Sequence, residues 1–333
     1  MTAPGDHPGV PPFFIVGCGR SGTSLLRTML DHHPAVCIPP EALCLIDLLR
    51  ARRAPIDRLR RTMLADHEIR AWGVPLDPGR YDDCTSAAAL IERVHELRAE
   101  QRAKPNWGHK TPRFVRHTGL LREHFPAARF VHVVRDPRAV ALSFMRSPLH
   151  RSNPLYAARR WRRDAGAGRQ LTDTHPERAI ETRYEDLVAE PRETLARVCA
   201  FLGLDFDERT LAYHRDAADE LRPSHRAIHA RLAAPPDPAR IHAWRDTLTP
   251  GQIRTIETIA GPLMDRFGYQ RLDPEPTPRT LPAFEAARYK AQRLAGLAGQ
   301  TLYALRRRGG FLPNFVARKL RLGLHRDLLD LNA

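Results

Sequence analysis

The sequence predicts an α/β protein whose central parallel sheet is covered by helices on both faces. Short apolar runs of strand length alternate along the chain with longer segments of helical periodicity, an order typical of a parallel sheet. Several of these runs end in polar or glycine-rich turns, which places candidate binding residues at the carboxyl edge of the sheet. With 333 residues, 42% of them hydrophobic, the chain can bury a full core.

Five segments are predicted to be strands, and they cover 13–16, 36–38, 106–109, 130–134 and 179–183. Helices are predicted between them. One begins at Thr23, a second begins at Pro137 because proline favours the first helical turn, and a third runs over 191–202 and closes with Gly203. Between the second and third strands, residues 50–105 carry apolar residues at helical spacing and are predicted to form a helical insertion.

The first predicted strand leads into a loop bounded by glycines. The spacing from Gly17 to Gly22 matches the opening of a phosphate-binding loop, in which the N–H groups of a helix N-terminus cradle phosphate. Thr23 stands where a nucleoside triphosphatase has lysine, and this departure argues against an ordinary ATPase or GTPase. An arginine inside the loop suits a phosphate held without a metal ion. Four side chains offer hydrogen bonds here: Arg20, Ser21, Thr23 and Ser24.

A second polar cluster follows the strand predicted at 130–134. Arg135 lies at the carboxyl end of that strand, and Ser143 lies two turns into the next helix. Both side chains are therefore expected near one another, where they could bind a further phosphate. The alternative is that Arg135 forms a salt bridge with its neighbour Asp136 and has no ligand.

Taken together, these motifs resemble the sulfotransferases that use 3′-phosphoadenylyl sulfate (PAPS), and they occur in that family's order. The loop over 20–24 is similar to the family's 5′-phosphosulfate loop, and Arg135 with Ser143 is similar to its 3′-phosphate site. Lys110 lies in a GHKTP segment and Tyr184 in a YEDL segment, both similar to family motifs, and a tryptophan segment begins at Trp244. The similarity covers 12–269, except for the insertion at 50–105.

The resemblance implies a fold and site roles. The fold is a P-loop-NTPase-like three-layer sandwich over 12–270, with the helical insertion and a basic helical C-terminal extension over 271–333. Lys110 is the candidate to stabilise the leaving phosphate, and Glu41 is the candidate base, as in the tyrosylprotein and carbohydrate branches rather than the cytosolic aryl type. Cofactor contacts are implied for Tyr184, Ser224 and Arg240. Glu41 follows Pro40 and is predicted to open a helix. The alternatives are that Lys110 is an ordinary surface lysine and that Glu41 only favours the start of that helix.

At two positions this chain lacks an arginine that the tyrosylprotein branch has. Leu43 and Cys44 stand where that branch has an arginine shortly after the glutamate. This absence argues against a tyrosine in an acidic peptide as the acceptor. Ser147 stands where it has another arginine, and Arg146 and Arg138 are the candidate substitutes. The insertion is a candidate for acceptor selectivity, or else an outer covering of the sheet.

The implied reaction is metal-independent transfer of a sulfuryl group from PAPS to a hydroxyl of a carbohydrate, a lipid, a secondary metabolite, a phenol or a tyrosine. Two other classes stay open. A P-loop small-molecule kinase would share the strand, loop and helix, and a non-catalytic nucleotide-binding protein would not need Lys110 or Glu41. Five cysteines without a CxxC pair indicate neither a zinc site nor a disulfide framework.

The formal net charge of +15 exceeds what a nucleotide cofactor requires. An anionic acceptor, an anionic surface or an arginine-rich genome would each account for it. From 279 to 333 there are 11 Lys or Arg against three acids. A helical stripe in this segment could dock on the core, form a homodimer or contact a membrane peripherally; its members are Phe284, Ala287, Ala291, Leu294, Ala298, Leu302 and Leu305.

The remaining features concern nucleic acid and localisation. No basic patch interleaved with aromatic residues and no finger motif supports nucleic-acid binding. The first residues lack the charged and apolar pattern of a signal peptide, and no apolar run approaches the length of a membrane span. We therefore expect a cytoplasmic protein.

Overall fold

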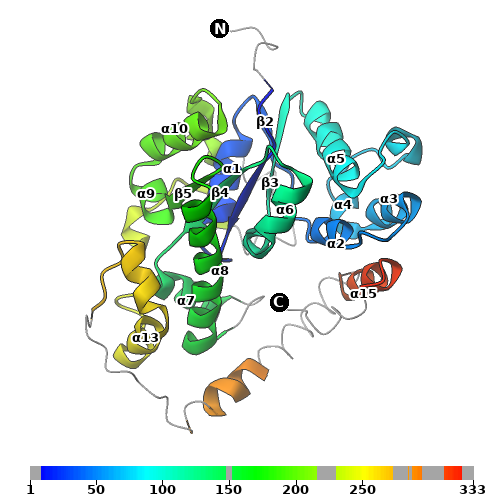
Figure 1. The fold of residues 1–333 in the computed structure, drawn as a ribbon. Coiled ribbons are helices and arrows are strands. Elements are labelled where there is room, and N and C mark those ends of the chain that lie inside the picture. The colour runs from blue at the N-terminus through cyan, green and yellow to red at the C-terminus, as the bar shows by residue number, and fades with distance from the viewer. Residues whose placement is uncertain are drawn as a thin grey trace.

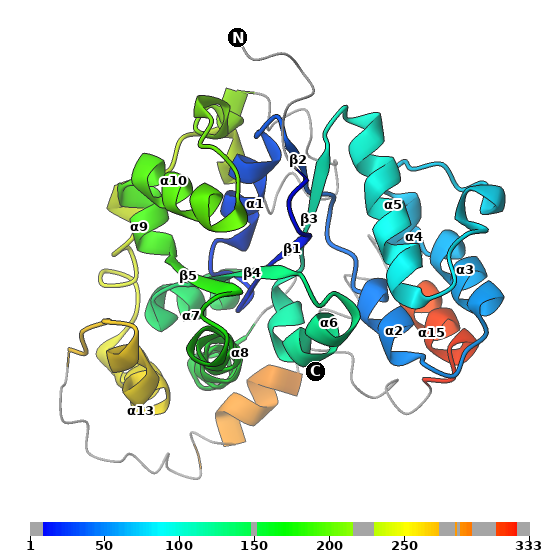
Figure 2. The ribbon, with the colours of Figure 1, turned by 45° about the horizontal axis from the view of Figure 1, so that its top comes forward.

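Five parallel strands form the central sheet of the computed structural model, which describes residues 9–147, 152–215, 230–272, 284, 287–294 and 311–324 (Figures 1 and 2). Their order across the sheet is β2-β3-β1-β4-β5, and every pairing is parallel. The strands are β1 (Phe13–Gly17), β2 (Val36–Cys37), β3 (Asn106–Lys110), β4 (Arg129–Val134) and β5 (Ala179–Arg183). All five predicted strands are confirmed, with ends shifted by one residue or less.

The pairing register brings the loops that follow the strands to one edge. Ile15 of β1 lies beside Lys110 of β3, and Gly17 lies beside Val133 of β4. Parallel strands end on the same side, so the loops after β1, β3 and β4 meet there. This is the edge at which the sequence places the phosphate-binding motifs.

Helices cover both faces of the sheet. They are α1 (Thr23–Asp31), α2 (Cys44–Arg50), α3 (Ile56–Ala65), α4 (His67–Arg70), α5 (Ala87–Gln101), α6 (Thr118–His124), α7 (Pro137–Arg146), α8 (Pro154–Thr174), α9 (Tyr184–Ala189), α10 (Pro191–Leu202), α13 (Pro250–Arg266) and α15 (Phe311–Arg321). The predicted starts at Thr23 and Pro137 are confirmed. The predicted helix over 191–202 is also confirmed. It ends at Gly203, which has the left-handed backbone conformation with φ 79°.

Alternation along β1 explains the three layers. Phe13 and Ile15 pack on one face of the sheet with the apolar sides of α1 and α10. Phe14 and Val16 pack on the other face, in a cluster that also contains α2, α3 and α5. A third cluster joins the ends of β1 and β4 to α7, α8 and α13. The predicted α/β sandwich is confirmed.

The insertion at 50–105 is helical, as predicted, and contains α3, α4 and α5. Figure 2 shows these helices beside the sheet, with α15 lying against α2 and α3. Arg318 and Lys319 of α15 are buried there, in contact with acids of the α2 to α4 region. The end of the chain therefore packs on the insertion.

The predicted apolar stripe is described only in part, since Ala298, Leu302 and Leu305 lie outside the described residues. Phe284 is 72% exposed and Leu294 is 60% exposed, and the alanines between them are exposed as well. In the described part, the stripe does not dock on the core; Tyr289, outside the stripe, is buried instead. None of the described helices has both the length and the apolar character needed to cross a membrane.

Candidate active site

The loop between β1 and α1 has the shape of an anion cradle. Arg20 and Gly22 both adopt the left-handed conformation, with φ values of 71° and 94°. Helix α1 begins directly afterwards and has no side-chain cap, so backbone N–H groups of its first turn point out of the helix. The Ser21 side chain is fully buried, and its Oγ has no hydrogen-bond partner among the described residues. A bound ligand or an ordered water would satisfy this buried hydroxyl.

Tyr184 lies over this loop. A Cβ built on Gly22 would come within 2.2 Å of Tyr184 Cδ2, so only glycine allows the approach. The Arg135 guanidinium lies 4.0 Å from the centre of the Tyr184 ring, within cation–π distance. The structure therefore brings the YEDL tyrosine to both phosphate-binding motifs.

Arg20 connects the two phosphate-binding motifs. Its Nε donates a hydrogen bond to Ser143 Oγ at 2.9 Å, and its backbone oxygen lies 3.4 Å from Arg135 Nη1. Ser143 and Arg135 were expected to lie near one another, and they do so on either side of Arg20. The Arg135 Nε is buried and has no hydrogen-bond partner among the described residues.

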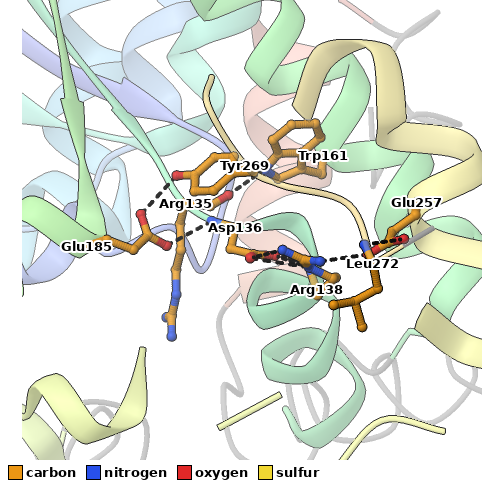
Figure 3. A network of polar contacts seen from close by, with 8 residues as sticks. All are labelled: Arg135, Asp136, Arg138, Trp161, Glu185, Glu257, Tyr269 and Leu272. Atoms are coloured by element: carbon orange, nitrogen blue, oxygen red, sulfur yellow. Dashed lines mark hydrogen bonds and ion pairs between the residues drawn. The ribbon is translucent and has the colours of Figure 1, made fainter. Parts of the chain in front are cut away.

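A polar network fixes the backbone at Arg135 (Figure 3). Trp161 Nε1 donates to the Arg135 carbonyl at 2.8 Å, and the Asp136 N–H donates to Glu185 at 3.0 Å. The Tyr269 hydroxyl donates a hydrogen bond to the other carboxylate oxygen of Glu185 at 2.8 Å. Figure 3 shows the Arg135 guanidinium pointing away from this network. The proposed salt bridge between Arg135 and Asp136 is wrong, because Asp136 pairs with Arg138 at 2.7 Å.

Lys110 and Glu41 meet at the loop. Lys110 ends β3 and is 4% exposed; its ammonium donates to Ser24 Oγ at 3.1 Å and forms an ion pair with the Glu41 carboxylate. Burial lowers the pKa of Lys110, the nearby Glu41 opposes that shift, and the charge of Arg27 adds to it. Arg27 also donates two hydrogen bonds to the Ile38 carbonyl, which holds the segment before Glu41 against α1.

Glu41 does not open a helix, contrary to the sequence prediction. It lies outside the helices and strands, and α2 begins only at Cys44. The N–H of Cys44 donates at 2.9 Å to the Glu68 carboxylate of α4. A carboxylate from the insertion thus satisfies the start of α2, which leaves Glu41 to face Lys110.

Comparison with known proteins decides the family. Residues 11–208 match the model of the sulfotransferase family, which is more than half of the chain. The chain belongs to the sulfotransferase family. It is 26% identical over 326 residues to the omega-hydroxy-beta-dihydromenaquinone-9 sulfotransferase of Mycobacterium tuberculosis, covering 80% of this chain and 77% of that protein.

Two further similarities agree with this assignment. Protein-tyrosine sulfotransferase A of Caenorhabditis elegans is 24% identical over 277 residues, covering 80% of this chain and 69% of that protein. Among solved structures, the sulfotransferase domain from the Synechococcus PCC 7002 olefin synthase aligns with a TM-score of 0.53 and 27% identity, covering 78% of this chain and 98% of that one. The predicted recognition and the P-loop-NTPase-like fold are confirmed.

Three candidate residues of this sulfotransferase make their side-chain contacts outside the loop over 20–24, and a fourth is not described. Arg138 is buried between Asp136 and Glu257 and stacks on Trp244, so it belongs to the framework of the fold. Arg146 is exposed, and its Nη2 lies 3.4 Å from Thr247 Oγ1. Arg240 is about half exposed and pairs with Asp237 at 2.9 Å, in a short turn that packs near α9. Ser224 lies outside the described residues.

A group of arginines near the loop between β1 and α1 was not predicted from the sequence. Arg113 and Arg116 follow the GHKTP segment, and Arg160 and Arg163 belong to α8. Arg160 precedes Asp164 by four residues, a spacing that places both side chains on one helix face, and the two form an ion pair at 3.7 Å. This spacing could have been recognised in the sequence. Only the structure shows that the turn after β3, which carries Arg116, lies beside α8.

Proposed function

We propose that this sulfotransferase transfers the sulfuryl group of PAPS to a hydroxyl acceptor without a metal ion. The observation that carries the proposal is the meeting of Lys110, Glu41 and Ser24 at the glycine-bounded loop. It places a buried cation and a carboxylate together beside the phosphate cradle. A general base and an electrostatic donor are the two groups that transfer to a hydroxyl requires.

The cradle fits the two anionic ends of PAPS, whose bound form would supply the activated sulfuryl group. Loop N–H groups with Arg20, Ser21, Gly22, Thr23 and Ser24 would hold the 5′-phosphosulfate. Arg135 and Ser143 would hold the 3′-phosphate, and Tyr184 would contact the nucleotide. The unpartnered Ser21 Oγ and Arg135 Nε support this fit. Contacts from Ser224 and Arg240 are proposed from the family resemblance.

Each of the two central residues has one role in the proposed reaction. Glu41 accepts the proton of the acceptor hydroxyl, which makes that oxygen a better nucleophile. Lys110 donates a hydrogen bond where negative charge grows on the leaving phosphate. Its burial strengthens this interaction, because a low dielectric screens the charge less than water does.

The class of acceptor is a hydroxyl compound: a carbohydrate, a lipid, a secondary metabolite or a tyrosine. The names of the relatives include a hydroxylated dihydromenaquinone and protein tyrosine as acceptors, so the family accommodates both. Leu43 and Cys44 still disfavour an acidic tyrosine peptide in this chain. We propose 12–270 as the transferase domain and 271–333 as a basic extension of a cytoplasmic enzyme.

The exposed stripe of the extension is available to a partner. Phe284 and Leu294 are exposed beside Arg288, Lys290 and Arg293, a combination that suits peripheral contact with an anionic membrane. A homodimer contact is the other use of such a face. Sedimentation onto vesicles containing anionic lipid, compared with the mass in solution, distinguishes the two.

The first experiment separates the proposed function from its alternatives. The purified protein is titrated calorimetrically with 3′-phosphoadenosine 5′-phosphate (PAP), the product nucleotide, in EDTA, and in parallel with ATP and Mg²⁺. We expect micromolar, metal-independent binding of PAP and no binding of ATP. The reverse pattern would indicate a kinase, and PAP binding without turnover across a broad acceptor screen would favour a non-catalytic nucleotide-binding protein.

A further inference from the structure

The peptide that joins Arg135 to Asp136 is held at both of its polar groups by side chains from other elements. Its carbonyl accepts a hydrogen bond from Trp161 Nε1 of α8 at 2.8 Å, and its N–H donates to the Glu185 carboxylate of α9 at 3.0 Å. On the other side of Arg135, β4 pairs with β5 up to the preceding residue. The backbone is therefore fixed on either side of Arg135, and this sets the direction in which its side chain leaves the chain.

Glu185 is itself oriented by Tyr269. The Tyr269 hydroxyl donates to the second carboxylate oxygen of Glu185 at 2.8 Å (Figure 3). Tyr269 follows α13 by three residues, is 5% exposed, and donates its backbone N–H to the Met264 carbonyl of that helix at 3.0 Å. Both carboxylate oxygens of Glu185 thus have partners. The carboxylate cannot turn away without leaving a buried donor unsatisfied, which is costly.

The contacts join segments that are far apart in the chain. Asp136 and Glu185 are separated by 49 residues, and Glu185 and Tyr269 by 84. Tyr269 lies outside the residues that match the family model, 11–208. Figure 3 shows the Arg135 guanidinium directed away from these contacts, and its buried Nε has no hydrogen-bond partner among the described residues. The contacts therefore hold the backbone and leave this donor to a ligand.

We propose that Glu185 and Tyr269 are positioning residues that give the cofactor site its preference for nucleotides with a 3′-phosphate. Tyr269 orients the Glu185 carboxylate, the carboxylate holds the peptide after Arg135, and this peptide directs the guanidinium at the 3′-phosphate. The inference deepens the proposed function and rests on it.

The sign of the effect separates positioning from charge. A carboxylate repels a nearby phosphate, so its charge alone predicts that removal of Glu185 strengthens the binding of PAP. Positioning predicts the opposite, because a displaced Arg135 loses its charge-assisted hydrogen bonds to the 3′-phosphate.

The test compares PAP with AMP, which lacks the 3′-phosphate, by calorimetry in EDTA. Glu185→Ala should lower the ratio of PAP affinity to AMP affinity by about tenfold, and Tyr269→Phe, which acts at one remove, by about threefold. Glu185→Gln keeps an oxygen that accepts from the Asp136 N–H, so its ratio should stay within about twofold of the wild type. A variant that is partly unfolded loses affinity for both nucleotides by the same factor, which leaves the ratio unchanged.

Two further variants complete the design. Tyr81→Phe is the matched control, because the Tyr81 hydroxyl donates to the Pro75 carbonyl at 2.9 Å and its fully buried side chain lies in the insertion. Its ratio should equal that of the wild type. In an Arg135→Ala background, Glu185→Ala should lower the ratio no further, since the group that Glu185 positions is then absent.

Three results would overturn the inference. They are an unchanged ratio in Glu185→Ala, tighter binding of PAP by that variant, and a further loss in the Arg135→Ala background, which would mean that Glu185 acts without Arg135. Failure of the proposed function has a different signature. In that case the wild type itself binds no PAP, or binds PAP and AMP equally, and the inference is then wrong as well.

Discussion

The Lys110 ammonium forms an ion pair with the Glu41 carboxylate, although 69 residues separate them in the sequence. The same ammonium donates to Ser24 at the start of α1. The GHKTP segment, the glutamate after β2 and the phosphate loop therefore converge on one point. Before an acceptor enters, the proposed base is held by the proposed electrostatic donor, and each fixes the orientation of the other.

Removal of either partner should stop turnover. We expect Glu41→Gln to lower kcat by at least about 10²-fold, because an amide keeps the contact but cannot take the proton. Lys110→Ala should cost about 10²- to 10³-fold, the usual effect of losing one electrostatic donor. The measurement is formation of PAP from PAPS with an acceptor that the wild type uses.

The matched control for the glutamate is Glu96→Gln, an exposed glutamate of α5 with a similar exposed fraction. It should leave kcat unchanged. PAP affinity should stay within about twofold in Glu41→Gln, since the change removes no phosphate contact. Retained turnover in Glu41→Gln would exclude its role as the base.

Arg135→Ala should weaken the binding of PAP and leave the binding of AMP nearly unchanged. Because AMP lacks the 3′-phosphate, a loss confined to PAP identifies the group that Arg135 binds. We expect about 10- to 100-fold weaker PAP binding, in line with one or two charge-assisted hydrogen bonds, and a change of less than about threefold for AMP. Calorimetry with both nucleotides gives the comparison, and equal losses would assign Arg135 to holding Tyr184 instead.

Gly22→Ala should displace Tyr184 and abolish nucleotide binding. The added methyl would lie 2.2 Å from the ring, and the backbone is left-handed at φ 94°. Gly73→Ala is the matched control, because it has φ 71° but nothing within 4 Å. Both variants pay the left-handed penalty of about 1 to 2 kcal/mol. Only Gly22→Ala should also lose PAP affinity in the calorimeter; equal affinities in the two variants would refute the steric account.

Most of the fold could be predicted from the sequence because its signals are local. The strands at 13–17 and 129–134 consist mostly of apolar residues. Pro137 and Pro191 mark helix starts, and Gly203 marks a helix end, through their own backbone preferences. The loop over 20–24 carries its function in adjacent residues. None of these predictions requires knowledge of a distant partner.

Contacts between distant segments were harder to predict. Glu41 was expected to open a helix, because Pro40 precedes it, but the cap of α2 is Glu68 from another helix. Arg138 was a candidate ligand contact until Glu257, 119 residues away, proved to be its partner. The arginines around Asp164 likewise combine a turn and a helix whose proximity depends on packing. Such pairings are set by tertiary structure, which local spacing does not encode.

Arg318 is predicted to fasten α15 to the insertion. Its guanidinium pairs with Asp47 at 2.8 Å and Asp66 at 2.7 Å, all three side chains being buried. Arg318→Met would leave these carboxylates without that cation, and breaking a buried pair in this way costs about 3 to 5 kcal/mol. Arg321→Met, on the exposed side of the same helix, should cost less than about 0.5 kcal/mol. Urea unfolding of both variants checks this, and similar losses would contradict it.

Glu68 is predicted to make stability fall as the pH rises. Burial raises the pKa of its carboxyl from 4.5 to about 7, although Arg318 opposes the shift. The folded protein thus holds this proton more tightly than the unfolded chain, so the favourable contribution is complete below pH 4.5 and is lost as the pH rises through 7. Glu68→Gln keeps an acceptor for the Cys44 N–H but cannot ionise. Between pH 4.5 and 7.5, the variant should gain about 1 to 3 kcal/mol relative to the wild type, measured by urea unfolding. A difference that stays constant, or changes in the opposite direction, would show that Glu68 is already ionised in the folded protein.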